Sequence, residues 1–299
     1  MPAKKPEEVG HNGIHFKFET CFAIDWRQLR VPEYLNEFNN QQHIQMRKIA
    51  LITGASSGIG KATAIKFADE KYDLILCGRR ASQLNGLKDE LSKHVNVETL
   101  VFDVRDKAEV DSALDSLDIN WKSIDILVNN AGNAHGLSPI NEGDVSDWDT
   151  MIDANVKGLL YVSKAIIPEM VKRKSGHIIN LSSVAGKQTY ANGSVYCASK
   201  RAVEALSEGM RLDLTKHGIK ITNIAPGAVN TEFSKVRFKG DMDRANKVYE
   251  GYEPLLAKDI ADLIFYTTNV PNRVTIADVT IYAKSQSAPT TIHKNQQES

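Results

Sequence analysis

The sequence predicts a single doubly wound Rossmann domain of the α/β class, a parallel sheet with helices on both faces. From Lys48 onward, short apolar runs alternate with segments of helical periodicity, which is typical of strands buried on both sides. A glycine-rich turn follows the first run, at the place where such sheets bind ligands. We expect this domain to span residues 46–284.

The strands and helices can be assigned in order along the chain. Helices are expected over Lys61–Glu70, through Leu84 to Leu91, and over Val110–Leu117. Right-handed crossovers then set the topology. The apolar runs expected to form strands are Lys48–Thr53, Tyr72–Cys77, Val97–Phe102, Ile124–Val128, His177–Leu181, Lys220–Ala225 and, as the last strand, Val274–Tyr282.

The two ends of the chain do not follow this alternation. Residues 1–45 form an N-terminal extension of unknown role whose aromatic residues, such as Trp26, are not typical of a disordered tail. The sequence leaves open an added or mis-started extension and an arm that packs on a neighbour. Residues 285–299 are polar and predict a loose C-terminal tail, with its start ordered against a partner subunit as an alternative.

Composition excludes several classes of function. The 299 residues balance 37 basic against 37 acidic side chains, so charge gives no case for nucleic acid or an anionic membrane as partner. The cysteines Cys21, Cys77 and Cys197 form no disulfide or zinc pattern, and the histidines show no metal-ligand spacing. No apolar run reaches the roughly 20 residues of a bilayer span, and no secretory signal is visible. We therefore expect a soluble cytoplasmic protein without a metal.

The turn Thr53–Gly60 predicts a nucleotide site. Gly54 permits a tight strand-to-helix turn, while Gly58 and Gly60 let backbone approach a pyrophosphate and the strand. Free N–H groups at the start of the helix then favour an anion. An ordinary glycine-rich loop is the alternative, and the strand before and helix after the turn favour the nucleotide.

The end of the second strand predicts NADP rather than NAD. Arg79 and Arg80 follow Gly78, where NAD-selective sites place an acid that binds the ribose 2′-hydroxyl. Arginine matches a 2′-phosphate in bidentate geometry. After the next two strands, Asp103 is placed to accept from the adenine amino group and Asn130–Gly132 to approach the adenine ribose.

A pair of residues on one helix predicts acid–base chemistry. Tyr196 and Lys200 are four residues apart, so they share a helix face. A nearby ammonium and a positive nicotinamide would lower the pKa of Tyr196 and let it exchange a proton with an alcohol or carbonyl. Ser183 is placed to bond the substrate oxygen, and Asn155 to hold a water that links Lys200 to solvent.

Together these motifs resemble the short-chain dehydrogenase/reductase family. The match covers Lys48 to Lys284 and includes Thr53–Gly60, Asn129–Gly132, the Tyr196/Lys200 pair and Pro226–Thr231. The resemblance implies that Asn155, Ser183, Tyr196 and Lys200 are catalytic, and that Lys200 also bonds the nicotinamide ribose. The cofactor-binding set that it implies is Gly54, Ser56, Ser57, Gly58, Ile59, Gly60, Arg79, Arg80, Asp103, Val104, Asn130, Ala131, Gly132, Tyr196, Lys200, Pro226, Gly227, Val229 and Thr231.

A second resemblance concerns the substrate. The segment Asn230–Asp241 is similar to the substrate loop of the NADP-dependent 3-hydroxy acid dehydrogenases, also described as serine or L-allo-threonine dehydrogenases and malonic semialdehyde reductases. The loop Ser234–Asp243 would then close over a substrate held by Ser183, Tyr196 and Arg237. We expect Arg237 to bind the substrate carboxylate with help from Lys239. A basic surface loop is the alternative.

Three functions therefore stay open. The first is oxidation of small 3-hydroxy acids or reduction of the matching 3-oxo acids; the second is another NADPH-dependent carbonyl reduction, as of a 3-oxoacyl thioester or a sugar. The third is a non-catalytic NADP-sensing protein, against which the four catalytic residues argue. The resemblance also implies a homotetramer.

Overall fold

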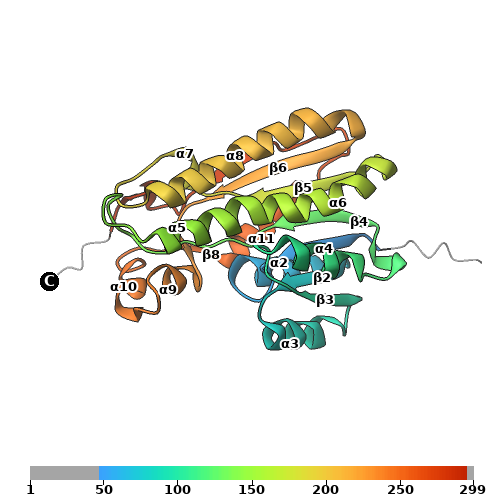
Figure 1. The fold of residues 1–299 in the computed structure, drawn as a ribbon, viewed down its shortest axis with the longest axis horizontal. Coiled ribbons are helices and arrows are strands. Elements are labelled where there is room, and N and C mark those ends of the chain that lie inside the picture. Colours follow the sequence, from blue (N-terminus) through green and yellow to red (C-terminus); the bar gives the residue numbers. More distant parts are fainter. Residues whose placement is uncertain (1–46, 295–299) are drawn as a thin grey trace, which may run out of the picture. The chain divides into compact units, whose positions relative to one another are not determined.

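The computed structural model describes residues 47–294, which contain a parallel sheet between two layers of helices (Figure 1). The strand order is β3-β2-β1-β4-β5-β6-β9, which reverses direction between β1 and β4. The predicted doubly wound fold is confirmed. The strands are β1 (Ile49–Thr53), β2 (Asp73–Gly78), β3 (Val97–Val101), β4 (Ile124–Asn129), β5 (Gly176–Leu181), β6 (Ile219–Pro226) and β9 (Asp278–Ile281).

Helices cover both faces because successive strand residues point in opposite directions. Leu51 and Ile75 face one core, against α4 (Lys107–Asp115), α6 (Leu159–Arg173) and α8 (Ser194–Leu214). Their neighbours Ile52 and Leu76 face the other core. That second core packs against α2 (Gly58–Asp69), α3 (Ala81–Leu91) and α11 (Ala257–Thr268).

The predicted elements exist, with shifted ends. The helix after β3 begins at Lys107 rather than Val110, because the Asp106 side chain accepts from the backbone N–H groups of Ala108 and Glu109. The helix after β1 begins at Gly58, inside the glycine-rich turn, so its free N–H groups point toward the end of β1.

Shorter elements surround the carboxyl ends of the strands. The expected loop Ser234–Asp243 is wrong in detail, since α9 (Phe233–Arg237) and the start of α10 (Met242–Lys247) fold there. A tight turn with Lys239 and Gly240 at positive φ separates these two helices. The remaining elements are η2 (Ile119–Trp121), α5 (Val145–Ile152), the π-helix η3 (Asp153–Gly158), α7 (Val184–Lys187), η4 (Thr215–His217), β7 (Val229–Asn230) and β8 (Leu255–Leu256).

The predicted loose tail is wrong at its start. β10 (Gln286–Ala288) pairs with β11 (Thr291–Ile292), and the buried side chain of Gln286 accepts a 2.8 Å hydrogen bond from the Ala228 N–H. Polar composition did not reveal this order, because the amide of Gln286 is satisfied inside the protein. The N-terminal extension and residues 295–299 lie outside the described residues. Within 47–294, no helix combines the length and apolar character that crossing a bilayer requires.

Candidate active site

The glycine-rich turn is clamped to the end of β4. Thr53 Oγ1 accepts from the N–H groups of Asn130 and Ala131, both at 3.0 Å. In return, Asn130 Nδ2 donates to the carbonyl oxygen of Thr53 at 2.9 Å. These hydrogen bonds fix the carboxyl ends of β1 and β4, which is where the sheet order reverses and where doubly wound folds bind ligands.

Glycine is required in the turn because no room exists for a side chain. Gly54 has φ +67°, and a methyl group added at Gly60 would lie 2.3 Å from the Gly54 carbonyl oxygen. At Gly58, an added methyl would meet the Thr231 side chain at 3.3 Å. Backbone N–H groups therefore stand open beside the N-terminus of α2, which is the arrangement that holds a phosphate.

A cavity of about 370 Å³ extends from this turn to the Tyr196 helix. Of the predicted residues, Gly60, Asn155 and Arg237 are not among those that line it, and Gly60 packs against the Gly54 carbonyl inside the turn. Sequence reasoning missed Arg105, Asn133, Glu232, Phe233 and Val236 among its walls. The predicted residues that line the cavity are Gly54, Ser56, Ser57, Gly58, Ile59, Arg79, Arg80, Asp103, Val104, Asn130, Ala131, Gly132, Ser183, Tyr196, Lys200, Pro226, Gly227, Val229 and Thr231.

Charged side chains gather where β2 and β3 end. The Asp103 carboxylate accepts from Arg105 at 2.7 Å and lies 3.5 Å from Arg79. Partial burial opposes the charge of Asp103, but the hydrogen bonds and charges of the two arginines prevail and lower its pKa. The ionised Asp103 therefore holds Arg79 and Arg105 on the wall of the cavity.

The Tyr196/Lys200 pair lies on one buried face of α8, as its spacing predicts. Lys200 Nζ donates to the Leu181 carbonyl oxygen at the end of β5, at 2.9 Å. Burial lowers the pKa of Lys200 to about 8, although nearby Glu204 opposes the shift. Lys200 thus titrates close to neutral pH while its side chain stays fixed against the sheet.

Tyr196 is protonated in this environment. Burial, helped by Tyr190, raises its pKa above the ordinary value, whereas the Ser183 hydroxyl and the charge of Arg237 lower it. The sequence pointed to Lys200 as the cation that lowers the pKa of Tyr196, whereas the cation with this effect in the structure is Arg237. A neutral Tyr196 is a proton donor, as reduction of a carbonyl requires.

Two adjacent serines at the end of β5 have different surroundings. Ser182 Oγ donates to the Lys200 carbonyl oxygen at 3.1 Å and ties α8 to the sheet. Ser183 caps α7 by accepting from Ala185 N–H at 3.1 Å, and it also lowers the pKa of Tyr196. Ser183 is therefore the serine placed to share a substrate oxygen with Tyr196.

Asn155 lies in the π-helix η3, and its amide group is hydrogen-bonded through both its oxygen and its nitrogen. Its Oδ1 accepts from Asn133 N–H at 2.8 Å, and its Nδ2 donates to Asn133 O and Ser199 Oγ. A methyl group added at Gly132 would lie 2.8 Å from Asn155 Oδ1 and 3.4 Å from Lys200 Nζ. The missing side chain of Gly132 keeps space between these two polar groups.

Arg237 projects from α9 toward the tyrosines. Its Nη2 donates to Tyr190 Oη at 2.8 Å, and its guanidinium carbon lies 5.5 Å from the centre of the Tyr196 ring. Its Nε is buried without a hydrogen-bond partner in the described part of the chain. A buried donor without a partner is costly, so this guanidinium fits an acceptor supplied by a ligand.

Lys239 and His135 do not line the main cavity. Lys239 bonds Asp147 at 2.9 Å, on α5, so it is not free to help Arg237 as expected. His135 and Asp147 line a small recess that shares Tyr196 with the main cavity, and burial lowers the pKa of His135. No cluster of side chains with metal-ligand character occurs within residues 47–294.

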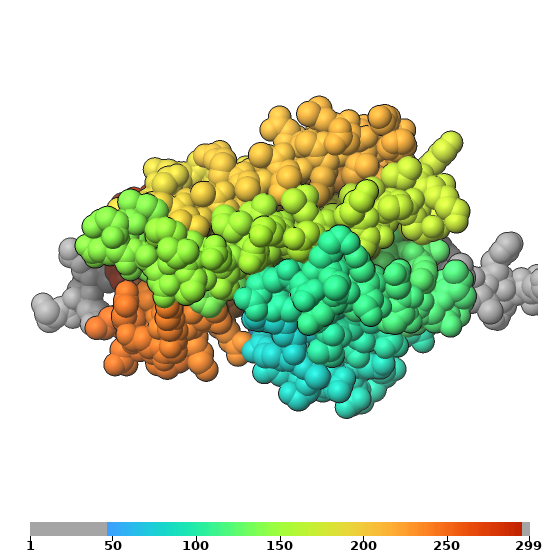
Figure 2. Space-filling model, in the orientation of Figure 1, coloured from blue at the N-terminus to red at the C-terminus, as the bar shows by residue number. Residues whose placement is uncertain are grey.

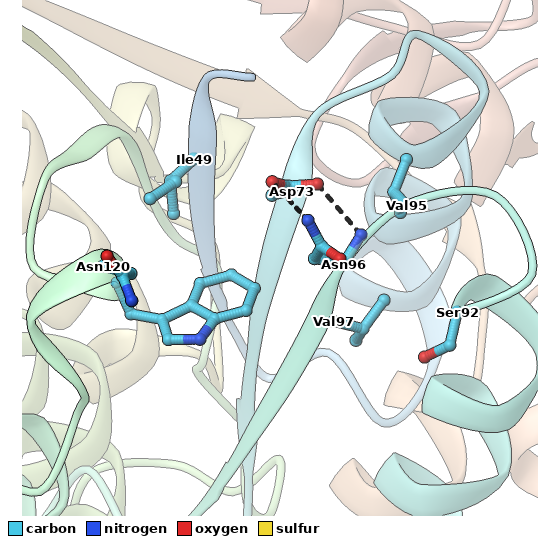
Figure 3. Close-up of a pocket in the computed structure, with 8 residues that line it drawn as sticks. Ile49, Asp73, Ser92, Val95, Asn96, Val97 and Asn120 are labelled. Atoms are coloured by element: carbon cyan, nitrogen blue, oxygen red, sulfur yellow. Dashed lines mark hydrogen bonds between the residues drawn. The ribbon is translucent and has the colours of Figure 1, made fainter. Parts of the chain in front are cut away.

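A second hollow, of about 470 Å³, opens at the opposite edge of the sheet (Figure 3). It lies among the first residues of β1, β2 and β3, where Asp73 accepts from the backbone and side chain of Asn96 at 2.9 and 3.0 Å. The amino ends of parallel strands are not where doubly wound folds bind ligands. Among the described residues that line this hollow, the only carboxylate is that of Asp73, which is already hydrogen-bonded, and none is placed to act as a catalytic group.

A doubly wound sheet with a phosphate cradle and a Tyr–Lys pair in one cavity defines a Rossmann-type oxidoreductase. Residues 48–241 match the family model described as short chain dehydrogenase. The chain belongs to this family, which confirms the resemblance found in the sequence.

Individual relatives agree. The chain is 43% identical to the NADP-dependent 3-hydroxy acid dehydrogenase of Salmonella typhi, over 83% of this chain and 100% of that protein. It is 44% identical to sulfoacetaldehyde reductase 2 of Chromohalobacter salexigens, over 77% of this chain and 92% of the relative. A solved closed form of serine dehydrogenase complexed with NADP+ is similar in structure, with a TM-score of 0.78, 41% identity and coverage of 83% and 100%.

Proposed function

We propose that this oxidoreductase uses NADP to interconvert the hydroxyl group of small 3-hydroxy acids, of the serine, allo-threonine or 3-hydroxypropionate type, with the matching carbonyl. The observation that carries the substrate class is Arg237, a guanidinium beside Tyr196 with one buried donor unused. A carboxylate on the substrate would accept from it while the hydroxyl carbon lies toward Tyr196.

The residues present fit a phosphorylated dinucleotide. The Gly54–Gly60 turn leaves backbone donors exposed for a pyrophosphate, and Arg79 and Arg105, beside Arg80, supply positive charge where a ribose 2′-phosphate would lie. Two of the proteins named above, the Salmonella relative and the serine dehydrogenase structure, carry NADP in their printed names, which supports this choice. When bound, NADP accepts a hydride from the hydroxyl carbon or returns one to the carbonyl carbon.

The chain's own residues handle the proton. In reduction, neutral Tyr196 donates its proton to the carbonyl oxygen, which also accepts from Ser183. In oxidation, Tyr196 must first lose its proton, and the burial that raises its pKa resists this. Lys200, with a pKa of about 8, supplies the second titrating group behind it. We therefore expect reduction to be favoured at neutral pH and oxidation to increase as the pH rises.

The space beside Gly132 supports the proposal that Asn155 holds a water linking Lys200 to solvent. A water between Asn155 Oδ1 and Lys200 Nζ would occupy the space that a side chain at Gly132 would fill. Asn155 then acts by holding this water and the Asn133 loop rather than by touching substrate.

A second substrate class has its own support. A sulfonate presents oxygen acceptors to Arg237 much as a carboxylate does, and the Chromohalobacter relative is named a sulfoacetaldehyde reductase. Reduction of a small aldehyde that bears a sulfonate is therefore the second candidate.

The test follows the near-ultraviolet absorbance of the reduced nicotinamide, with NADP and with NAD. The substrates are L-serine, L-allo-threonine, D-threonine and 3-hydroxypropionate, with sulfoacetaldehyde in the reductive direction and neutral alcohols and carbonyls as controls. Turnover of the anionic substrates with NADP, and little with NAD, is expected. Turnover of neutral compounds alone would discard the role of Arg237, and NADPH binding without any turnover would favour a regulatory protein.

Assembly and location are further proposals. We propose a homotetramer, to be tested by light scattering of the purified chain, for which a monomer is the contradicting result. We also propose a cytoplasmic location, in keeping with the free, buried thiols of Cys77 and Cys197.

A further inference from the structure

The segment from Thr231 to Lys239 crosses the cavity and is tied at both ends. Near its start, Glu232 Oε2 accepts from Arg80 Nη1 at 3.0 Å, on the cofactor side. Near its end, Lys239 pairs with Asp147, and Gly136 N–H donates to the Arg237 carbonyl oxygen at 3.0 Å. Phe233 and Val236, between the two ties, line the cavity. In Figure 2, orange atoms, whose colour covers this segment and the residues after it, lie next to blue atoms from the first described part of the chain.

The two arginines after β2 are engaged differently. Arg80 donates from Nε and Nη2 to Ser56 Oγ at 3.1 and 3.0 Å, from Nη2 to Ser57 Oγ at 2.6 Å, and from Nη1 to Glu232. Four of its five N–H groups are therefore occupied. Arg79 lies 61% exposed, and its only ion pair among the described residues is the 3.5 Å contact with Asp103. The guanidinium N–H groups of Arg79 are therefore free to bind a ligand, whereas most of those of Arg80 are not.

The Arg80–Glu232 pair lies at the opening of the cavity. Both residues line it, and their side chains stay 41% and 53% exposed. The glycine-rich turn and the Thr231 segment approach each other there, as the contact distance of 3.3 Å between an added Gly58 methyl and Thr231 indicates. A dinucleotide whose pyrophosphate lies on this turn would be enclosed under the ion pair.

We propose that Arg80 and Glu232 form a latch that holds the Thr231–Lys239 segment closed over the bound dinucleotide. The latch rests on the proposed function, because it assumes that the cavity binds NADP. Glu232 is a positioning residue that acts through Arg80. Its hydrogen bond to Arg80 is the largest cause that lowers the pKa of the Glu232 carboxyl, which keeps the pair ionised at neutral pH.

The alternative role of Glu232 predicts the opposite sign. If Glu232 only competed with the phosphate for Arg80, its removal would tighten cofactor binding and slow release. A latch predicts faster release on removal, and equally so for NADPH and NADH, because the latch does not touch the 2′-phosphate. Exposed ion pairs are weak and easily broken, so we expect an effect of about 3- to 5-fold.

The experiment measures release of NADPH and NADH from the full chain by stopped-flow nicotinamide fluorescence. The variants are Glu232→Gln, Arg79→Gln and, as a matched control on the same side of the fold, Glu250→Gln, whose exposed carboxylate makes no ion pair among the described residues. We expect Glu232→Gln to speed release of both nucleotides by the same factor, so that the preference for NADPH over NADH is unchanged. Arg79→Gln should lose the preference for NADPH by about 10-fold or more, and Glu250→Gln should match the wild type.

The dependence of the release rate on salt concentration distinguishes loss of the latch from a general loss of structure in Glu232→Gln. Release from the wild type should accelerate with ionic strength, whereas release from Glu232→Gln should respond less, because its ion pair is already broken. Slower release from Glu232→Gln, or a rate equal to the wild type, would overturn the latch. If the wild type bound no NADPH, the proposed function would fail as well. If Arg79→Gln lost its preference while Glu232→Gln behaved as wild type, the latch alone would fail.

Discussion

Replacing Arg237 tests the substrate class directly. In Arg237→Ala, the substrate's anionic group loses its charged donor near Tyr196, and Tyr190 Oη loses the donor that lies 2.8 Å away. A hydrogen bond to a charged group is worth about 1.5–3 kcal/mol, so kcat/KM for the preferred acid should fall by about 10- to 150-fold. Neutral substrates do not use this interaction, and their kcat/KM should change by less than about 3-fold.

The assay compares kcat/KM for one anionic and one neutral substrate in three variants. Arg237→Lys keeps the charge without the planar fork, so its loss should be intermediate. Arg244→Ala removes an exposed arginine of the same region, which stacks on Phe238 at 4.6 Å, and should change neither substrate. A loss in Arg237→Ala that is equal for both substrates would refute the reasoning, since it would reflect disturbance of Tyr196 rather than recognition of an anion.

Three further predictions concern the turn and two buried groups. Gly60→Ala should prevent cofactor binding and lower the melting temperature, because its methyl would lie 2.3 Å from the Gly54 carbonyl oxygen. Gly86→Ala, in open space on a helix, should instead stabilise the protein by about 0.5–1 kcal/mol. Equal melting temperatures of the two variants would contradict this. Burial lowers the pKa of Lys200 from 10.5 to about 8, so the unfolded chain holds a proton that the folded one has lost in that range, and the stability that the group contributes rises with pH there. In urea unfolding without cofactor, Lys200→Met should therefore be more stable than the wild type below pH 8, by about 2–3 kcal/mol. This gain in stability should disappear as the pH rises to 10.5. A gain that does not depend on pH would contradict the prediction. Burial also lowers the pKa of His177 from 6.5 to about 4, so its contribution to the free energy of unfolding is present above pH 6.5 and lost as the pH falls toward 4. In His177→Gln, the free energy of unfolding should therefore fall less steeply between pH 6.5 and pH 4. An unchanged pH dependence would exclude His177 as the cause of the fall.

Local patterns in the sequence predicted what local geometry determines. The four-residue spacing of Tyr196 and Lys200 placed both on one helix face, and the apolar runs gave the strands to within a few residues. The glycines of the first turn lie at positions with positive φ or little room for a side chain, as their sequence pattern predicts.

Contacts between distant residues were not predictable. Glu232 is separated by 152 residues from Arg80, and Arg237 by 47 from Tyr190, so no periodicity connects them. The sequence treated Arg79 and Arg80 as equivalent, whereas their different partners distinguish them in the fold. It also assigned Lys239 to the substrate, because nothing local indicated that Asp147 would lie beside it.

The central claim is that hydride leaves the hydroxyl carbon of the substrate while Tyr196 takes the hydroxyl proton. Its most direct test uses the best hydroxy acid, deuterated at that carbon, and detects the label in the nicotinamide by mass spectrometry. The wild type should form deuterated NADPH, and Tyr196→Phe, which lacks the proton acceptor, should form it about 100-fold or more slowly while still binding NADPH. Absence of label in the wild-type product, or undiminished transfer in Tyr196→Phe, would contradict the account.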